Sequence, residues 1–193
     1  MTVREILTYP KFKMDLRARS EPIRAFNRQI RHTIKDLKET LMAHQDGIGL
    51  AAPQIGIHFR TLVVRLGGRN DWDSEAGPPI ALINPEIVEK GDDRKDFDGC
   101  LSFPGLFGET IRPHYLRVTG LTEHGNPFDQ IYRGFDAVLV HHEIDHLDGV
   151  LFIDHTESLD DLYRVSLDYD GKTVRIPMAK ILPKMEEMVE FLI

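Results

Sequence analysis

The sequence has few cysteines, no excess of basic residues and no long apolar run. Its one cysteine, Cys100, cannot form a disulfide within the chain. The formal net charge is -7, which argues against a broad nucleic-acid-binding surface, because phosphate binding needs a basic face. No apolar stretch approaches the roughly 20 residues that a membrane-spanning helix requires. We therefore expect neither nucleic acids nor membranes as direct partners.

The N-terminal segment MTVREILTYPKFK lacks the apolar core of a signal peptide and the Arg/Ser richness of a transit peptide. We therefore expect a cytoplasmic protein. The chain has 193 residues, of which 41% are hydrophobic and 28% are charged, as in ordinary globular proteins. This length allows one domain with a substantial core and is too short for two, so residues 1–193 are predicted to form a single domain.

Residues 20–47, SEPIRAFNRQIRHTIKDLKETLMAHQDG, predict a surface helix. Ser20 is a candidate cap, Pro22 suits a first turn, and Gly47 lies just past the end. Apolar side chains recur at helical spacing along one face, at Phe26, Ile30, Ile34, Leu37 and Leu41.

A second helix is predicted at residues 135–147, FDAVLVHHEIDHL, between Gly134 and Gly149, and it is apolar enough to be buried. The short strand candidates are RTLVVRL, IALINPEIVEK, YLRVTGLTE and DQIYRG, and LGGRNDWDSEAGPP is a loop by composition. The tail holds a candidate hairpin around Asp170 and Gly171 and a final helix, PKMEEMVEFLI. The pattern predicts an α+β fold: mostly antiparallel short sheets packed around a central helix, with an N-terminal surface helix and a C-terminal helix.

The central helix contains His142 and His146, which are four residues apart. At that spacing two imidazoles differ in direction by about 40° and can point at one metal ion. Together with Glu143 they match the H-E-x-x-H pattern. Glu143 is offset from that face and is better placed to reach a water at the metal than to be a ligand. His141 points about 100° away from its neighbour and is not expected to join the site.

The third metal ligand stays open on the residues alone. One group of zinc proteases places a final histidine where this chain has Phe152, which cannot bind a metal. Glu157 has weak support, because its surroundings resemble a loop. Cys100 would complete a tetrahedral site with one open position, although a single cysteine is more often a small buried hydrophobe. Helical histidines satisfied by hydrogen bonds are the alternative without a metal.

Three ordered motifs resemble those of the peptide deformylase family: GIGLAAPQ at residues 47–54, GCLS at residues 99–102, and HEIDHLDG at residues 142–149. The stretches ILTYP and LINPEI are also similar, so the resemblance covers about residues 3–155. It implies hydrolysis of the N-formyl group from the N-terminal methionine of newly made polypeptides, with release of formate. The family-like core would then be catalytic, and residues from about 156 to 193 would form an atypical tail.

The resemblance also implies roles for individual residues. It makes Cys100, His142 and His146 the metal ligands and Glu143 the general base and then the general acid. The side-chain amide of Gln54 and the backbone N–H of Leu101 would donate hydrogen bonds to the developing oxyanion. Gly49 would offer backbone contacts to an extended peptide, and the candidates for the methionine pocket are Ile48, Phe135, Val138 and Leu139. The metal would be one divalent ion, usually Fe²⁺ in this family, with Zn²⁺, Ni²⁺ or Co²⁺ as substitutes.

Three positions depart from the family pattern. Asp98 replaces a glutamate, with Arg112 as its candidate partner; His141 replaces a glutamine; and Phe107 stands where bacterial members often have arginine. The last helix is acidic and apolar, which does not support ribosome docking; it would pack on the body or on a second subunit, as in a homodimer. Two alternatives follow: an H-E-x-x-H metallopeptidase with another third ligand, or a deformylase-like protein with altered substrate preference or no turnover.

Overall fold

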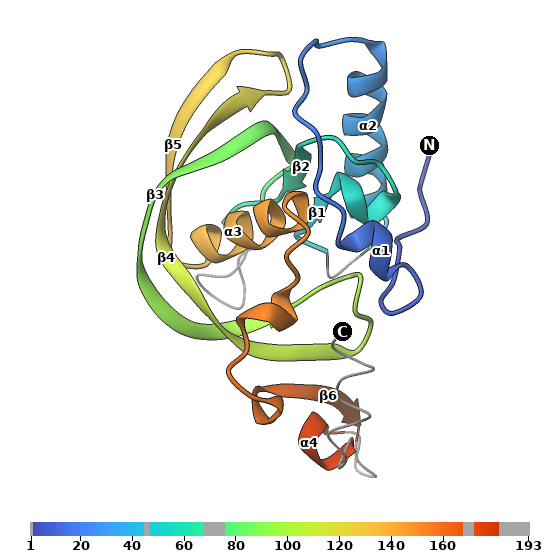
Figure 1. The fold of residues 1–193 in the computed structure, drawn as a ribbon, viewed down its shortest axis with the longest axis vertical. Helices are drawn as coiled ribbons and strands as arrows, with labels where there is room; N and C mark the ends of the chain where they lie inside the picture. The colour runs from blue at the N-terminus through green and yellow to red at the C-terminus, as the bar shows by residue number, and fades with distance from the viewer. Residues whose placement is uncertain (1, 45–46, 68–75, 168–171, 182–193) are drawn as a thin grey trace.

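The computed structural model describes residues 2–44, 47–67, 76–167 and 172–181. An antiparallel sheet and a helix inside its curve organise the chain (Figure 1). The helices are α1 (Lys13–Leu16), α2 (Arg28–Met42), α3 (Phe135–Leu147) and α4 (Met178–Ile181), with 3-10 turns η1 (Ala52–Ile55), η2 (Phe152–His155) and η3 (Leu159–Asp161). The strands are β1 (Gly49–Ala51), β2 (Thr61–Val64), β3 (Ile80–Gly99), β4 (Leu106–Thr122), β5 (Pro127–Arg133), β6 (Leu162–Leu167) and β7 (Thr173–Pro177).

The sheet has the order β1-β2-β3-β4-β6-β7, and β5 pairs with β4. All of these pairings are antiparallel, which confirms the predicted α+β class. The prediction of short strands is wrong for β3 and β4, which run for 20 and 17 residues. The second half of β3 is rich in charged residues and does not alternate cleanly. It is a strand because it pairs with β4 as far as Gly99 opposite Phe107.

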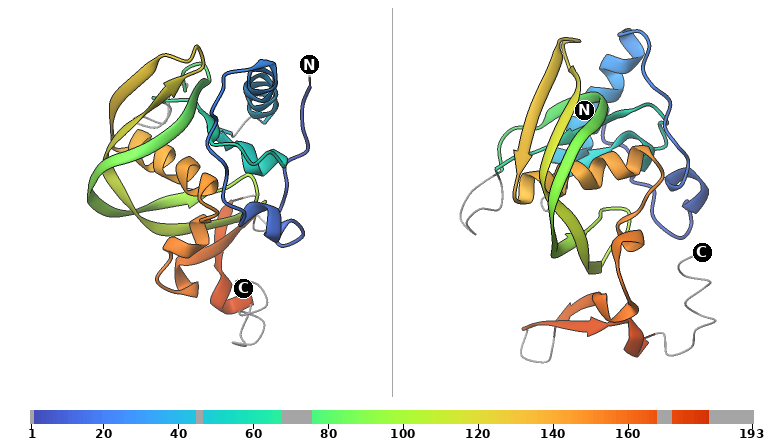
Figure 2. Two further views of the ribbon diagram at one scale, coloured as in Figure 1. Left: turned by 45° about the horizontal axis from the view of Figure 1, so that its top comes forward. Right: turned by 60° about the vertical axis from the view of Figure 1, so that its left-hand side comes forward.

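Helix α3 has the predicted bounds and lies in the curve of β3 and β4 (Figures 1 and 2). Its apolar residues pack into one core cluster with β2, β4 and β5, including Leu62, Leu116 and Tyr132. Because nearly all of its side chains are buried, the helix is a rigid support for any site that it carries.

Helix α2 starts later than predicted. Its cap is Asn27, whose side chain accepts a hydrogen bond from the backbone N–H of Ile30 at 3.1 Å. Ser20 is not a helix cap; its backbone N–H donates to the carbonyl of Leu147 at 2.8 Å, next to the end of α3. Pro22 lies in the irregular segment before the helix. Of the predicted stripe, Ile30, Ile34, Leu37 and Leu41 are buried as expected, whereas Phe26 lies before the helix and is only partly buried.

In the tail, β6 pairs with the beginning of β4 and with β7. The pairing of Leu167 with Thr173 agrees with a hairpin, although the predicted turn at Asp170 and Gly171 lies outside the described residues. The predicted final helix at 183–193 and most of the predicted loop at 66–79 also lie outside the described residues. Among the described helices, none is long and apolar enough to cross a membrane.

Candidate metal centre and active site

The predicted ligands come together at one point between α3 and the end of β3. The rings of His142 and His146, one helical turn apart, have centroids 5.0 Å apart. Cys100 directly follows β3, and its Sγ lies 3.2 Å from Nε2 of His146. The candidate ligand atoms of these three residues all lie within 4.8 Å of one another. A thiolate and two imidazoles suit a tetrahedral divalent metal with one open position. Glu157, the alternative ligand, instead lines a separate surface depression.

Asp98 orients the first of the two histidines. Nδ1 of His142 donates a hydrogen bond to Oδ1 of Asp98 at 2.8 Å, which leaves Nε2 to face the metal position. The other carboxylate oxygen accepts from Nε of Arg112 at 2.9 Å and from the hydroxyl of Thr110 at 3.0 Å. Burial alone would raise the pKa of Asp98, but its interactions with His142 and Arg112, including a hydrogen bond from each, outweigh burial and lower that pKa. The aspartate therefore stays ionised in place of the longer glutamate.

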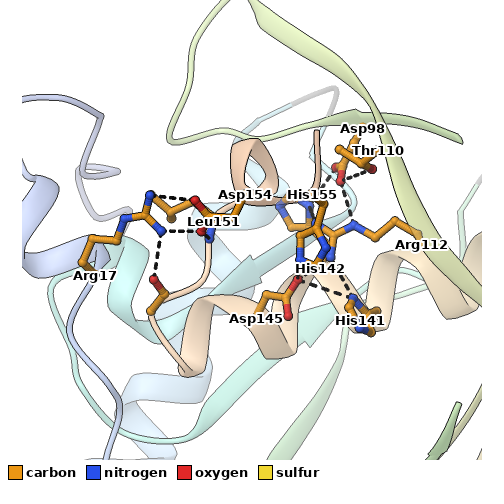
Figure 3. A network of polar contacts seen from close by, with 11 residues as sticks. Arg17, Asp98, Thr110, Arg112, His141, His142, Asp145, Leu151, Asp154 and His155 are labelled. Carbon is orange, nitrogen blue, oxygen red and sulfur yellow. Dashed lines mark hydrogen bonds and ion pairs between the residues drawn. The ribbon is translucent and has the colours of Figure 1, made fainter. Parts of the chain in front are cut away.

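Arg112 is fully buried and links Asp98 to a second carboxylate, Asp145 (Figure 3). Asp145 also accepts a hydrogen bond from Nε2 of His155 at 2.8 Å, and Nδ1 of His141 lies 2.7 Å from Nη1 of Arg112. The group His141, Asp145 and His155 has metal-ligand spacing. The guanidinium touches two of its members, so a fixed positive charge already neutralises that carboxylate. As predicted, His141 lies outside the first metal group.

One buried polar atom beside the candidate ligands supports the fit of a water, and the donor set itself suits a metal. Oε2 of Glu143 has no hydrogen-bond partner among the described residues, and Nε2 of His146 faces Sγ of Cys100 at 3.2 Å. Burial lowers the pKa of His146 to about 3, which keeps its imidazole in the neutral form that binds metals. Burial also raises the pKa of Glu143 to about 7, the range in which a carboxyl group both accepts and returns a proton.

Gly49 brings the edge strand β1 against α3. A Cβ atom at this position would clash with Oε1 of Glu143 and would lie only 2.8 Å from Cδ1 of Leu139. Only glycine therefore allows β1 to pass so close to α3. Leu139 and Ile48 pack in the same cluster, so these two candidates for the methionine pocket adjoin Gly49. The other two, Phe135 and Val138, lie in the first turns of α3, where Val138 is buried.

Gln54, in η1, turns its amide toward the metal position. Its Oε1 accepts a hydrogen bond from the backbone N–H of Ala51 at 2.8 Å. Its Nε2 lies 3.4 Å from Sγ of Cys100 and 3.2 Å from the hydroxyl of Ser102. The first bond fixes which end of the amide faces the sulfur, so a donor points into the site. Leu101 follows Cys100 directly, and its half-buried side chain packs against the cluster around α2.

Some residues that support the site were not expected from the sequence. Ser102 and Thr110 each bond to a residue of the site, and His155 reaches Asp145 from η2. Thr110 could have been identified from the sequence, because it is two positions before Arg112 on a strand and therefore shares its face. No sequence pattern identifies His155, because its position depends on how the chain folds back after α3. Arg17 ties η2 to the N-terminal segment through Asp154 (Figure 3).

Comparisons with known proteins agree with this geometry. Residues 3–161 match the family model described as polypeptide deformylase. Peptide deformylase 1 of Bacillus subtilis is 40% identical over 155 residues, which are 79% of this chain and 89% of that protein. The peptide deformylase of Dehalococcoides mccartyi is 39% identical over 168 residues, 87% of this chain and 95% of that protein.

Solved structures give the same result for the fold. The crystal structure of peptide deformylase from Ehrlichia chaffeensis matches with a TM-score of 0.73 and 35% identity, covering 81% of this chain and 89% of that one. The enzyme from Thermotoga maritima matches with a TM-score of 0.71 and 35% identity, covering 82% of this chain and all of that one. With the family motifs gathered at one buried site, this chain belongs to the peptide deformylase family.

Proposed function

We propose that this enzyme hydrolyses the N-formyl group from the N-terminal methionine of newly synthesised polypeptides in the cytoplasm and releases formate. One observation carries the proposal: the ligand atoms of Cys100, His142 and His146 lie within 4.8 Å of one another, and the amide of Gln54 lies 3.4 Å from the sulfur. Glu143, the residue after His142 on α3, is buried and has a carboxylate oxygen without a hydrogen-bond partner among the described residues. This combination supplies metal ligands, a proton acceptor and an oxyanion donor around a single reacting carbon.

Cys100, His142 and His146 would hold one divalent ion, with Fe²⁺ as the native metal and Zn²⁺, Ni²⁺ or Co²⁺ as substitutes. When bound, such an ion supplies a water of lowered pKa and polarises a carbonyl oxygen. The thiolate favours these softer transition metals over Mg²⁺ or Ca²⁺, which prefer oxygen ligands. The bond from His142 to Asp98 keeps the imidazole in the tautomer that can bind.

Glu143 would accept a proton from the attacking water while the oxygen of that water bonds to the formyl carbon. When the carbon–nitrogen bond breaks, the same carboxyl group would return that proton to the leaving amine. Its pKa of about 7, raised by burial, suits both steps. The products are formate and a peptide with a free amino terminus.

The oxyanion that develops on the formyl oxygen needs donors that are in place beforehand. Gln54 is held for this role by its bond to Ala51, and the Leu101 N–H would be the second donor. The peptide would lie along β1 as an added strand, with backbone contacts to Gly49. Its methionine side chain would enter the apolar pocket assigned to Ile48, Phe135, Val138 and Leu139.

The test is formate release from a formyl-Met-Ala-Ser peptide by Fe²⁺-loaded protein without oxygen. We expect turnover by the native chain and its loss in Glu143→Ala protein that retains its metal. Absence of formate from fully loaded native protein would refute the proposal. The metallopeptidase alternative predicts instead that Cys100→Ala protein keeps its metal and cleaves internal peptide bonds.

A further inference from the structure

His155 joins the polar network of the site from outside the three sequence motifs. It is the last residue of η2, and its Nε2 donates a hydrogen bond to Oδ2 of Asp145 at 2.8 Å. An ionised carboxylate only accepts, so this nitrogen carries the proton. The two side chains are 25% and 14% exposed. The bond therefore connects η2 to α3, the helix that carries both candidate imidazole ligands.

From Asp145 the polar contacts lead to one of those ligands (Figure 3). Asp145 forms an ion pair with Nη1 of Arg112, and Nε of the same guanidinium donates to Asp98 at 2.9 Å. Asp98 in turn accepts from Nδ1 of His142 at 2.8 Å. An unbroken series of hydrogen bonds and ion pairs therefore runs from His155 to His142.

The enclosed guanidinium of Arg112 links the position of Asp145 to that of Asp98. Its side chain is fully buried, so water cannot replace a partner that is lost. Its remaining neighbour on this side is Nδ1 of His141, at 2.7 Å from Nη1. Without the bond from His155 the carboxylate of Asp145 can rotate. The guanidinium then shifts with it and displaces the carboxylate of Asp98.

The turn that carries His155 is itself anchored. Asp154 accepts a hydrogen bond from the backbone N–H of Leu151 and another from Nη2 of Arg17, both at 2.9 Å. Phe152 is 1% exposed and packs edge-on against Phe103, with ring centroids 5.1 Å apart. The turn η2 is therefore held by groups outside the network and can keep the imidazole of His155 in place.

The two candidate imidazole ligands differ in how they are held. Nδ1 of His142 is bonded to Asp98, whereas Nδ1 of His146 has no hydrogen-bond partner among the described residues. The orientation of His146 therefore depends on packing. Since the network ends at His142, a change at His155 should alter one ligand and leave Cys100 and His146 as they are.

We propose that His155 is a positioning residue for His142: it holds Asp145 against Arg112 and so fixes the Asp98 carboxylate that orients the imidazole. This inference rests on the proposed metal site and deformylase function. His155 belongs to a different group of side chains from the three candidate ligands, so it acts through the network and not on the ion. Its loss should weaken metal binding, and in metal-saturated protein it should lower kcat with KM unchanged.

The experiment compares two amides at this position. The amide nitrogen of glutamine can take the place of Nε2 of histidine, whereas that of asparagine is one methylene too short to reach Asp145. His155→Gln should stay within about twofold of the native metal affinity, measured by competition with a chromogenic chelator. His155→Asn and His155→Ala should weaken it by about three- to tenfold. The asparagine and glutamine pair carries the test if the alanine variant does not fold.

Two further measurements test the route. The ligand-field absorption bands of bound Co²⁺ should shift in His155→Asn protein and stay native in His155→Gln protein, because only the first loosens a ligand. In an Asp98→Asn background, His155→Ala should cause less than about twofold further loss of metal affinity, since the network is already broken. Equal losses with and without Asp98 would overturn the inference, as would native affinity and native bands in the asparagine variant.

The matched control is His44→Ala, which removes an imidazole whose Nδ1 lies 2.9 Å from the carbonyl of Thr40 at the end of α2. It should leave metal affinity and the Co²⁺ bands unchanged, and a loss equal to that of His155→Ala would also overturn the inference. Native protein that binds no metal through Cys100 would refute the proposed function. Native metal binding that is the same in every His155 variant would refute only the role of His155.

Discussion

Nδ1 of His142 donates a hydrogen bond to Oδ1 of Asp98 at 2.8 Å, and both groups are buried. The same carboxylate bonds to Arg112, which is fully enclosed. A shorter acid thus fills the position where a glutamate was the expected residue, and the buried arginine and the hydroxyl of Thr110 complete its hydrogen bonding. The geometry of a candidate metal ligand is therefore set from the strand opposite the helix.

Asp98→Asn should weaken metal binding by about 10- to 100-fold, because it removes the charge that fixes the imidazole and balances Arg112. Asp98→Glu keeps the carboxylate and should stay within a few-fold of the native affinity. Competition with a chromogenic chelator measures both. Native affinity in the asparagine variant would show that the carboxylate does not support the metal.

Gly49→Ala should lower kcat by at least about tenfold, because the added methyl group displaces the carboxylate of Glu143. The metal ligands are not touched, so the metal content should equal that of the native protein. Gly91→Ala is the matched control, because a Cβ atom there meets nothing within 4 Å. Full activity of the Gly49 variant would contradict the close approach of β1 to α3.

Gln54→Ala should lower kcat by about 10²- to 10³-fold with little change in KM, since the amide would act on the oxyanion in the transition state. Gln130→Ala, which changes an exposed amide on β5, is the control. A similar rise in KM with kcat unchanged would instead assign Gln54 to substrate binding. Steady-state kinetics on a formyl-Met peptide distinguishes the two outcomes.

The parts of the fold that could be predicted are those set by local pattern. Helix α3 is an apolar run between two glycines, and its bounds follow from that. The start of α2 could not be predicted in the same way, because Pro22 fits a first turn as well as an irregular segment, and Ser20 and Asn27 are both residue types that cap helices. The charged half of β3 is extended only because β4 pairs with it, and such pairing joins distant segments.

The residues of the candidate site likewise fall into those that a sequence pattern predicts and those that depend on the fold. His142, Glu143 and His146 follow from spacing on one helix, and Cys100 follows from a motif. The pairing of Asp98 with Arg112 was also expected and is confirmed. The contact of Tyr163 with Phe107 was not, because it depends on the register of β6 against β4, which no local pattern encodes.

Tyr132, which packs against α3 from β5, gives a pH test of the core. Burial, with a smaller effect from Asp136, raises its pKa to about 12. A phenol whose pKa is higher in the folded state stabilises the protein fully below pH 10, and this contribution is lost as the pH rises through 12. Between pH 9 and 11, native protein should lose about 1 kcal/mol more stability than Tyr132→Phe protein in denaturant unfolding. If the free energy of unfolding of both proteins fell by the same amount between pH 9 and 11, the ring would not be buried against α3.

The most direct measurement of the central claim is X-ray absorption spectroscopy at the metal edge of Fe²⁺- or Co²⁺-loaded protein. We predict a shell with one sulfur and two imidazole nitrogens, and loss of the sulfur in Cys100→Ser protein. A shell of nitrogen and oxygen alone in the native protein, with Cys100 still free to react with a thiol reagent, would contradict it.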